Sequence, residues 1–488
     1  MEAFSTEKYL KLQSEKILER IEQSSEKLYL EFGGKLFDDY HAGRVLPGFY
    51  PDAKIKLLQT LKEKAELIIC ISAEAIHIDK MRADYGISYG DDVLRLIDEF
   101  KNLNLEVNSI VITQYKNEYN IAKFKNRLEG NGVKIYIHNY IEGYVSDIEN
   151  LLSENGYGKN EYIVTTKPLV VVTGPGPCSG KLATCMSQLY NEYKRGNKAQ
   201  YAKFETFPVW NLPLKHPVNI AYEAATVDLE DVNMIDPFHL ETYGEVAVNY
   251  NRDIEVFPVV RNIMQRISGN LKYNSPTDMG VNMVAYCIED EEAVCTAAKQ
   301  EVICRYYKVL CDLKKGHTSE KAFERMKILM NELDLKPEDR KVVGYAIEKS
   351  EMSNSQAVAI ELKTGEIITG RTNDIMTAGA STILNAIKHI AGLNDKILLI
   401  SENILKPILE MKTKLLGNKN CLLDINDVLI ALSVCAVTNP TVEIAVSKLP
   451  ELNGVQAHAT YMFGETEETV YRNLKITLTE EPNYSYLI

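Results

Sequence analysis

The chain has 488 residues, of which 45% are hydrophobic and 25% are charged, and its net charge at pH 7 is −13. This length exceeds what one ordinary hydrophobic core holds, so two to four domains are expected. The acidic balance excludes nucleic acid as the main partner, and no apolar run is long enough to cross a membrane.

The N-terminal residues 1–22 are charged and helical in pattern, without the apolar centre of a signal peptide. The nine cysteines are scattered and contain no Cys-x-x-Cys pair. Their odd number does not suit a disulfide framework. We therefore expect a cytoplasmic protein that holds no zinc and no haem.

The first two hundred residues alternate between strand and helix patterns. Strands are predicted at residues 28–32, 67–72, 109–113, 134–138, 169–172 and 199–204, and helices at 53–65, 91–103, 121–128, 144–154 and 179–194. Nearly continuous apolar strands that alternate with helices are typical of a parallel sheet covered on both faces. This predicts a Rossmann or P-loop-like α/β fold, with the loops after residues 32, 72, 113 and 173 on the carboxyl edge of the sheet.

A glycine loop follows the strand at residues 169–172 and reads Thr-Gly-Pro-Gly-Pro-Cys-Ser-Gly-Lys. Glycine lets backbone N–H groups approach phosphate oxygens, and a helix N-terminus and a lysine add positive charge. The sequence therefore predicts a site for ATP or GTP with Mg²⁺, formed by Gly174, Gly176, Ser179, Gly180 and Lys181.

The loop departs from the standard P-loop in three respects. Five residues rather than four separate Gly174 from the Gly-Lys pair, two prolines remove N–H donors, and Leu182 stands where a Mg²⁺-binding hydroxyl is usual. Ser179 and Thr184 are alternative hydroxyls. The alternative interpretation is a turn that only packs a helix against the sheet.

The remaining chain divides by pattern. Residues 205–285 read as long functional loops, so the first domain is expected at residues 1–288, followed by a small helical domain at 289–350. A C-terminal α/β domain is expected at 351–488. It contains a hairpin at 357–370, helices at 381–391, 403–416 and 425–435, strands at 397–401 and 441–446, and a terminal helix and strand.

Three groups outside the glycine loop are candidates for chemistry. Lys203 and Glu205 share one face of a strand. His41 and His239 lie among acidic residues in loops. The catalytic candidates are therefore Lys181, Lys203, His41 and His239. Substrate-binding candidates are Gly33, Gly34, Lys35, Arg44 and Glu223, and metal candidates are Asp228, Asp231 and Asp236. The alternatives for these residues are helix caps and solvated surface charges.

The C-terminal hairpin and the helix after it follow the order of a deaminase-like sandwich. The helix start reads Ala-Gly-Ala-Ser and carries no zinc ligand, so zinc deamination is not expected. The small residues there could bind a ligand or pack against a subunit. His458 is interpreted as a core or interface residue.

Several motifs along the chain resemble a bacterial family of similar length that is described as a domain of unknown function. They are Leu-Glu-Phe-Gly-Gly-Lys at 30–35, Arg-Val-Leu-Pro-Gly at 44–48, the glycine loop at 173–181, Tyr-Glu-Ala-Ala-Thr at 222–226, Ile-Asp-Pro-Phe-His at 235–239 and Ser-Pro-Thr-Asp-Met-Gly at 275–280. The resemblance implies an N-terminal Rossmann or P-loop-like region, a helical domain and a C-terminal domain of deaminase-like topology. It implies no established reaction.

The order of glycine loop, Lys181, helix, Gly196 and a strand with Lys203 is also similar to P-loop synthetases such as dethiobiotin synthetase and CTP synthase. We therefore expect an ATP- or GTP-dependent ligase or small-molecule kinase that acts on an anionic metabolite and forms a homo-oligomer. Two alternatives stay open. One is a transferase or lyase for a phosphorylated metabolite that uses no nucleoside triphosphate, and the other is a non-enzymatic protein that senses an anion.

Overall fold

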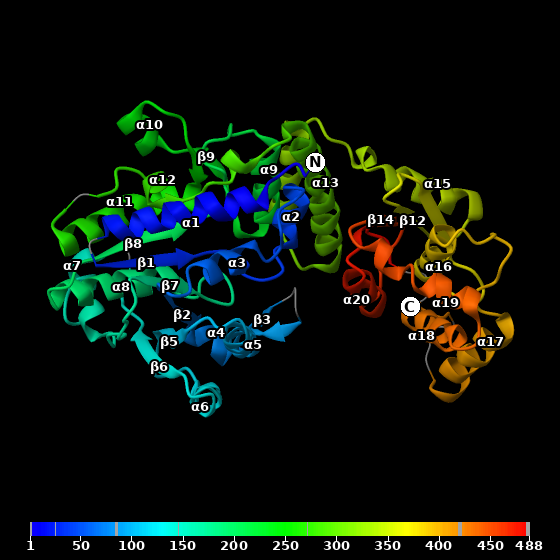
Figure 1. The fold of residues 1–488 in the computed structure, drawn as a ribbon, viewed down its shortest axis with the longest axis horizontal. Helices are drawn as coiled ribbons and strands as arrows, with labels where there is room; N and C mark the ends of the chain where they lie inside the picture. Colours follow the sequence, from blue (N-terminus) through cyan, green and yellow to red (C-terminus); the bar gives the residue numbers. More distant parts are fainter. Residues whose placement is uncertain are drawn as a thin grey trace. The chain divides into compact units, whose positions relative to one another are not determined.

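A seven-stranded sheet organises the N-terminal part of the chain, and all of its strand pairs are parallel. In spatial order the strands are β11 (Gly280–Val281), β8 (Ala199–Phe204), β1 (Lys27–Phe32), β7 (Leu169–Thr173), β2 (Ala65–Ser72), β5 (Val107–Tyr115) and β6 (Lys134–Asn139). The central strand is β7, and Figure 1 shows β1 and β8 on one side of it and β2, β5 and β6 on the other. The glycine loop therefore leaves the middle of the carboxyl edge.

The computed structural model describes residues 2–24, 26–82, 86–144, 146–270, 272–417 and 422–484. The chain forms two compact units. The first comprises Met1–Glu223 and Asp231–Ala298, and the second comprises Ala224–Glu230 and Lys299–Ile488. The division falls within one long helix, α13 (Glu291–Lys315).

Both faces of the sheet are covered, as the continuous apolar strands predict. In β1 the successive side chains of Leu28, Tyr29 and Leu30 point to alternate faces, and all three are fully buried. The face of Tyr29 packs against α8 (Lys181–Lys194) and α11 (Asn251–Ser268), whose apolar residues share one core cluster with the strands. The parallel α/β fold of this region is thus confirmed.

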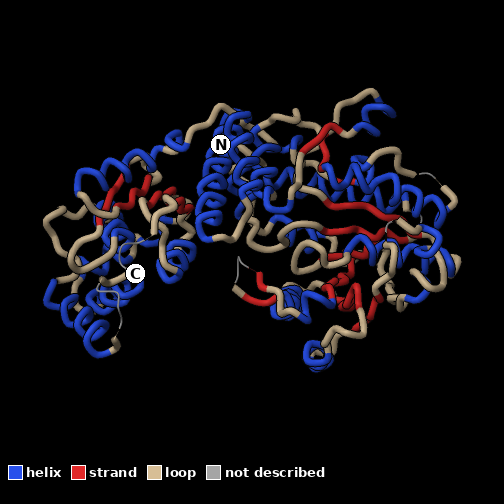
Figure 2. Tube along the Cα trace, turned by 180° about the vertical axis from the view of Figure 1, so that it is seen from behind, coloured by secondary structure: helices blue, strands red, loops and turns tan. Residues whose placement is uncertain are grey.

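The helices of the first unit surround this sheet, and Figure 2 distinguishes them from strands and loops. They are α1 (Thr6–Gln23), α2 (Tyr40–Val45), α3 (Ala53–Thr60), α4 (Ala73–His77), α5 (Tyr89–Asn102), α6 (Ala122–Gly130), α7 (Ile148–Leu151), α9 (Pro217–Ala225), α10 (Pro237–Tyr243) and α12 (Pro276–Met279). Two two-stranded antiparallel sheets also belong to the unit, one of β3 (Met81–Arg82) with β4 (Ile87–Ser88) and one of β9 (Asn233–Ile235) with β10 (Val248–Tyr250). Among the described helices, none is long and apolar enough to cross a lipid bilayer.

The second unit contains a separate mixed sheet. Its strands lie in the order β13 (Ile367–Arg371), β12 (Ala357–Glu361), β14 (Gln456–Ala459) and β15 (Thr477–Glu480), and only β14 and β15 pair in parallel. The helices are α14 (Glu320–Glu332), α15 (Lys341–Ser353), α16 (Ala378–Ile390), α17 (Glu402–Glu410), α18 (Ile425–Ala436), α19 (Pro440–Val446) and α20 (Glu465–Asn473). The predicted hairpin followed by a helix is confirmed.

Three of the predicted elements differ in the structure. Residues 205–285, predicted as loops, contain α9 to α12, and α11 continues past Pro258 because the apolar residues of its buried face pack against the sheet and α8. Residues 441–446 form helix α19 rather than a strand, because Asn439 caps the helix N-terminus and Pro440 occupies its first position. Residues 397–401 form no strand, and the side chain of Leu398 is 72% exposed.

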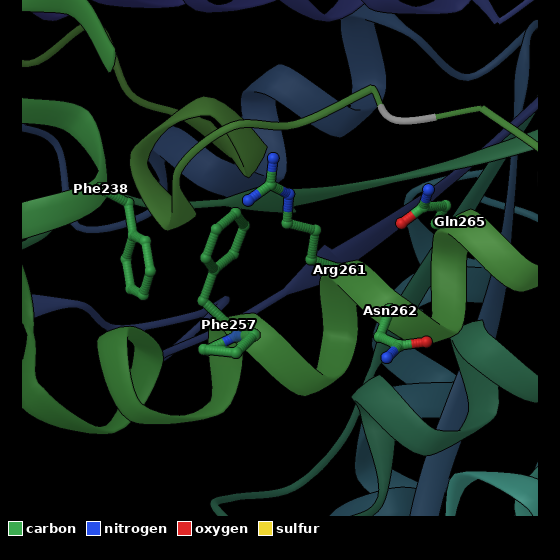
Figure 3. Close-up of a pocket in the computed structure, with 6 residues that line it drawn as sticks. Phe238, Phe257, Arg261, Asn262 and Gln265 are labelled. Carbon is green, nitrogen blue, oxygen red and sulfur yellow. The ribbon is translucent and has the colours of Figure 1, made fainter. Parts of the chain in front are cut away.

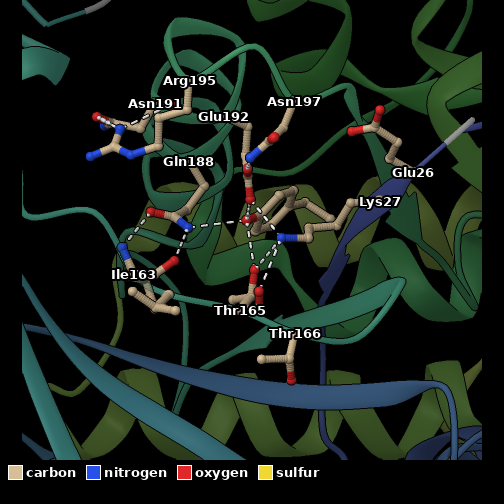
Figure 4. A network of polar contacts seen from close by, with 12 residues as sticks. Glu26, Lys27, Ile163, Thr165, Thr166, Gln188, Asn191, Glu192, Arg195 and Asn197 are labelled. Atoms are coloured by element: carbon tan, nitrogen blue, oxygen red, sulfur yellow. Dashed lines mark hydrogen bonds and ion pairs between the residues drawn. The ribbon is translucent and has the colours of Figure 1, made fainter.

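A buried polar network joins the end of α8 to the start of β1 (Figure 4). The Glu192 carboxylate accepts hydrogen bonds from Lys27 Nζ at 2.7 Å, Tyr29 Oη at 2.8 Å and Asn197 Nδ2 at 2.8 Å. Burial alone would raise the pKa of Glu192, but hydrogen bonds from Lys27, Asn197 and Tyr29 lower it below its ordinary value. The network fixes the C-terminal end of α8, the helix that begins directly after the glycine loop.

We predict that Glu192→Gln lowers the free energy of unfolding by about 2–3 kcal/mol at pH 7, because the charged acceptor of these hydrogen bonds is lost. A lowered pKa contributes stability above the ordinary value of 4.5, and this stability is lost as the pH falls through the folded-state pKa. The difference from wild type should therefore shrink below about pH 4.5. Urea unfolding across pH 3–7 measures this, with exposed Glu22→Gln as the control. A difference that does not depend on pH would contradict it.

Candidate functional site

The glycine loop is held by close packing against the neighbouring elements. A Cβ atom added at Gly176 would lie 2.4 Å from Tyr89 Oη, and one at Gly174 would lie 2.5 Å from the Cys70 carbonyl oxygen. At Gly180 the backbone has φ 85°, and a Cβ would lie 2.5 Å from Thr113 Oγ1. All three glycines therefore have a packing requirement, whatever the loop binds.

Helix α8 begins directly after this loop, and its N-terminus has no side-chain cap. Gly180 stands at the N-cap position and has no side chain that could accept from the N–H groups of the first turn. Lys181 Nζ lies 3.3 Å from the Gly176 carbonyl oxygen, so its ammonium folds back over the loop. Ser179 is buried and donates to the same carbonyl, and Thr184 accepts a hydrogen bond from the Cys70 thiol inside the core.

Strand register places the loop beside a group of charged residues. Val172 of β7 pairs with Glu31 of β1, and Glu31 pairs with Lys203 of β8. Residues paired in this way across parallel strands point to the same face. That face is the one covered by α8 and α11. Glu31 and Lys203 therefore lie near the N-terminal ends of both helices.

We call Glu31, Lys203, Glu205 and Asp253 the Lys203 cluster. Lys203 Nζ lies 3.0 Å from Glu205 Oε1 and also pairs with Asp253 in the first turn of α11, while Glu31 accepts a hydrogen bond from Tyr201 Oη at 2.7 Å. The predicted shared face of Lys203 and Glu205 is confirmed. Burial alone would lower the pKa of Lys203, but the charges of Asp253, Glu205 and Glu31 raise it, so this lysine is an ammonium ion.

The Glu205 carboxyl group is the titratable member of the cluster. Its side chain is 9% exposed, and burial raises its pKa to about 7, although the ammonium of Lys203 acts in the opposite direction. Gly280 of the edge strand leaves room for it, because a Cβ there would lie 2.6 Å from Glu205 Oε2. A carboxyl group that titrates near neutral pH is suited to accept or donate a proton during a reaction.

Tyr222 connects this cluster to His41. Its ring lies 4.6 Å from the Phe207 ring and 5.7 Å from the His41 ring, measured between centroids. Burial is the main cause that raises the pKa of Tyr222, followed by the charge of Asp39, and the charges of the Lys203 cluster also act on it. Residues predicted as separate groups from β1, α2, β8 and α9 thus gather around one side of the carboxyl edge.

The predicted substrate-binding residues lie along the same edge but are not all brought together. Gly33, Gly34 and Lys35 follow β1, and Gly34 and Lys35 are exposed. Arg44 is on α2. Glu223, on α9, is buried and accepts the Asn233 backbone N–H at 3.0 Å, so it ties α9 to the start of β9.

Lys54 and Asp39 form a buried ion pair behind the loop that follows β1. The distance from Lys54 Nζ to Asp39 Oδ2 is 2.9 Å. Burial alone would raise the pKa of Asp39, but the charge of Lys54 lowers it, so both groups are ionised. A Cβ atom at Gly34 would lie 3.1 Å from Lys54 Nζ. The backbone of Gly34 has φ 71°, a conformation that favours glycine, where the loop passes this ammonium.

The three predicted metal-binding aspartates are not grouped by the structure. Asp236 caps α10 and accepts hydrogen bonds from two N–H groups of that helix and from Thr277. Asp231 pairs with Arg252 at 2.9 Å, and Asp228 belongs to the second unit and accepts a hydrogen bond from Thr318.

The second predicted histidine, His239, lies on α10. It is buried, and its Nδ1 lies 3.0 Å from Ser275 Oγ at the start of α12. Its ring lies 6.0 Å from the Trp210 ring and 4.7 Å from the Tyr243 ring. These contacts tie α10 to its neighbours in the first unit.

Among the described residues, one group of three has the geometry for a metal ion, and it was not predicted. His216 Nε2 lies 2.5 Å from Glu291 Oε1 and 3.6 Å from Cys295 Sγ. The Val218 N–H donates to Nδ1 at 3.2 Å, which requires a lone pair on Nδ1 and therefore places the proton on Nε2. In this tautomer His216 donates to Glu291 and is satisfied without a metal.

A hollow of about 360 Å³ lies on α11, lined by Phe238, Phe257, Pro258, Arg261, Asn262 and Gln265 (Figure 3). The Arg261 guanidinium carbon lies 5.9 Å from the centre of the Phe257 ring. Arg261 follows Asp253 by two helical turns, or about 12 Å along the axis. None of the four residues of the Lys203 cluster lines the hollow.

Comparison with known proteins identifies the chain's relatives. Residues 2–334 match the model "Domain of unknown function DUF1846, N-terminal", and residues 338–487 match its C-terminal counterpart. The chain is 55% identical over 490 aligned positions to a UPF0371 protein of Clostridium botulinum strain Langeland, covering 99% of this chain and 97% of that protein. It is 54% identical, with the same coverage, to a UPF0371 protein of Clostridium tetani.

We predict that Glu205→Gln changes how stability depends on pH. A carboxyl group whose pKa is raised on folding stabilises the protein below its ordinary value of 4.5, and this contribution falls as the pH rises to about 7. The wild type should therefore lose about 2–3 kcal/mol relative to Glu205→Gln between these pH values. Chemical unfolding at steps of pH measures it, with exposed Glu63→Gln as the control. Parallel profiles for all three proteins would contradict the raised pKa.

Proposed function

The chain belongs to the DUF1846 family, and we propose that it is an ATP- or GTP-dependent enzyme that transfers a phosphoryl group to an anionic metabolite. The observation that carries the proposal is the uncapped N-terminus of α8, with Lys181 in its first turn, at the middle of the carboxyl edge of a parallel sheet. Free N–H groups and a positive helix end stabilise phosphate at such a position. Ligands of open α/β sheets bind at this edge.

In this proposal the first turn of α8 and Lys181 hold the terminal phosphates of the nucleotide. The ammonium of Lys181 leaves the Gly176 carbonyl, 3.3 Å away, and pairs with a phosphate oxygen. A full charge in this place stabilises the charge that develops on the phosphoryl group during transfer. The packed glycines keep the loop rigid, so little ordering is needed on binding.

The Lys203 cluster then binds and activates the acceptor, which is the metabolite that receives the phosphoryl group. The ammonium of Lys203 attracts the anionic acceptor, and Glu205, with a pKa of about 7, takes the proton from the attacking group as the new oxygen–phosphorus bond forms. The bond between the γ-phosphorus and its bridging oxygen breaks in the same step, and the nucleoside diphosphate leaves. Mg²⁺ binds one or two protein carboxylates together with phosphate oxygens. Glu31 pairs with Val172 of the strand that leads into the loop, and Asp253 pairs with Lys203, so we assign the metal contact to Glu31 and Asp253.

A second candidate is a transferase or lyase for a phosphorylated metabolite without a nucleoside triphosphate. The observation that favours it is that all three loop glycines are required for packing, while Pro175 and Pro177 donate no N–H. A single phosphate group would then occupy the α8 N-terminus. The Lys203 cluster would keep its role in proton transfer.

We predict that Lys181→Ala weakens ATP or GTP binding in the presence of Mg²⁺ by at least about tenfold, because one charged hydrogen bond to phosphate is lost. Isothermal titration calorimetry with each nucleotide measures the affinity. Lys198→Ala is the matched control, since Lys198 is exposed beyond the other end of α8.

Equal nucleotide affinity of wild type and Lys181→Ala would refute the assignment of the loop. Binding of inorganic phosphate that depends on Lys181, without binding of either triphosphate, would favour the second candidate.

A further inference from the structure

A positively charged pocket of about 270 Å³ lies in the second unit, separate from the elements that form the proposed nucleotide site. It is lined by the end of α15, by β13 and the loop after it, and by the first turns of α16. The strand and the helix pack closely at the bottom of the pocket, because a Cβ atom added at Gly370 would lie 2.4 Å from Thr382 Oγ1. β13 and α16 therefore meet closely and leave the hollow beside them.

Two cations line this pocket, Lys349 from α15 and Arg371 from the end of β13. In the part of the chain that the structure describes, neither side chain forms a hydrogen bond, an ion pair or a cation–π contact. No Asp or Glu is among the residues that line the pocket. Positive charge is thus concentrated there without an internal counter-ion.

The neutral polar residues of the pocket are held in defined positions. Asn373 Oδ1 accepts the N–H groups of Ile375 at 2.9 Å and Met376 at 3.0 Å, which fixes its amide so that Nδ2 donates to Ser381 Oγ at 3.4 Å. Ser381 is only 9% exposed, and among the described residues its hydroxyl has no acceptor. Asn385 donates to the Thr369 carbonyl oxygen at 3.0 Å. The buried hydroxyl proton of Ser381 is therefore available to a ligand.

We propose that this pocket is a second ligand site, which binds a small phosphate monoester. Arg371 can bind two phosphate oxygens through its guanidinium, Lys349 adds the second positive charge that balances a dianion, and Ser381 donates to the remaining oxygen. The volume lies just below the range of about 300–1,000 Å³ that holds drug-sized ligands. The size therefore suits the phosphate group of a small metabolite.

The test uses the full-length protein carrying Lys181→Ala, so that phosphate binding at α8 does not contribute. Calorimetry with glycerol 3-phosphate should show saturable binding, while glycerol should not bind. Adding Arg371→Gln should weaken the affinity at least tenfold, and adding Ser381→Ala should weaken it several-fold. Lys363→Gln is the matched control, because Lys363 is an exposed cation on the hairpin turn outside the pocket.

Equal affinity with and without Arg371→Gln would overturn the proposal, and so would the same loss in Lys363→Gln, which would indicate only general attraction to positive charge. Tighter binding of citrate than of glycerol 3-phosphate would also contradict a phosphate monoester as the ligand. Thermal unfolding of each variant identifies any that fails to fold, and Arg371→Lys, which keeps the charge, should then retain part of the affinity. These outcomes do not depend on whether the α8 site binds a nucleotide.

Discussion

The contact of the Lys203 ammonium with the Glu205 and Asp253 carboxylates is the constraint around which the first unit is arranged. Buried carboxylates close to each other are unfavourable unless a cation lies between them. Lys203 provides that cation from the sheet, and Asp253 reaches it from the first turn of α11. This ion pairing fixes where the N-terminus of α11 lies over the sheet, next to the N-terminus of α8.

The other parts of the edge depend on this arrangement. Glu31 lies between the glycine loop strand and Lys203, so the two regions share one row of residues across β7, β1 and β8. Tyr222 packs its ring against His41 of α2, and the charges of Lys203 and Glu205 act on its hydroxyl group. The far end of α8 is tied to β1 by Glu192, so the helix is held at both ends and its uncapped first turn stays aligned with the sheet.

The sequence predicted the features that follow from local periodicity and strand order. The period of two in a strand places Lys203 and Glu205 on one face, and parallel strands gather the loops after β1, β2, β5 and β7 at one edge. Asp253 was missed because its pairing with Lys203 arises only when α11 folds back over the sheet, and Pro258 made that helix look like a loop. Asp228 and Asp236 were grouped because they are close in the sequence. In the structure Asp236 caps α10, whereas Asp228 accepts a hydrogen bond from Thr318.

The close packing of Gly280 against Glu205 limits which residues members of the family can carry at these two positions. Gly280 on the edge strand faces this carboxylate so closely that even a methyl group would displace it. The two positions lie far apart in the sequence but share one small volume. A relative that carries a larger residue at position 280 must therefore shorten or reorient the side chain at position 205, so substitutions at these positions should be coupled.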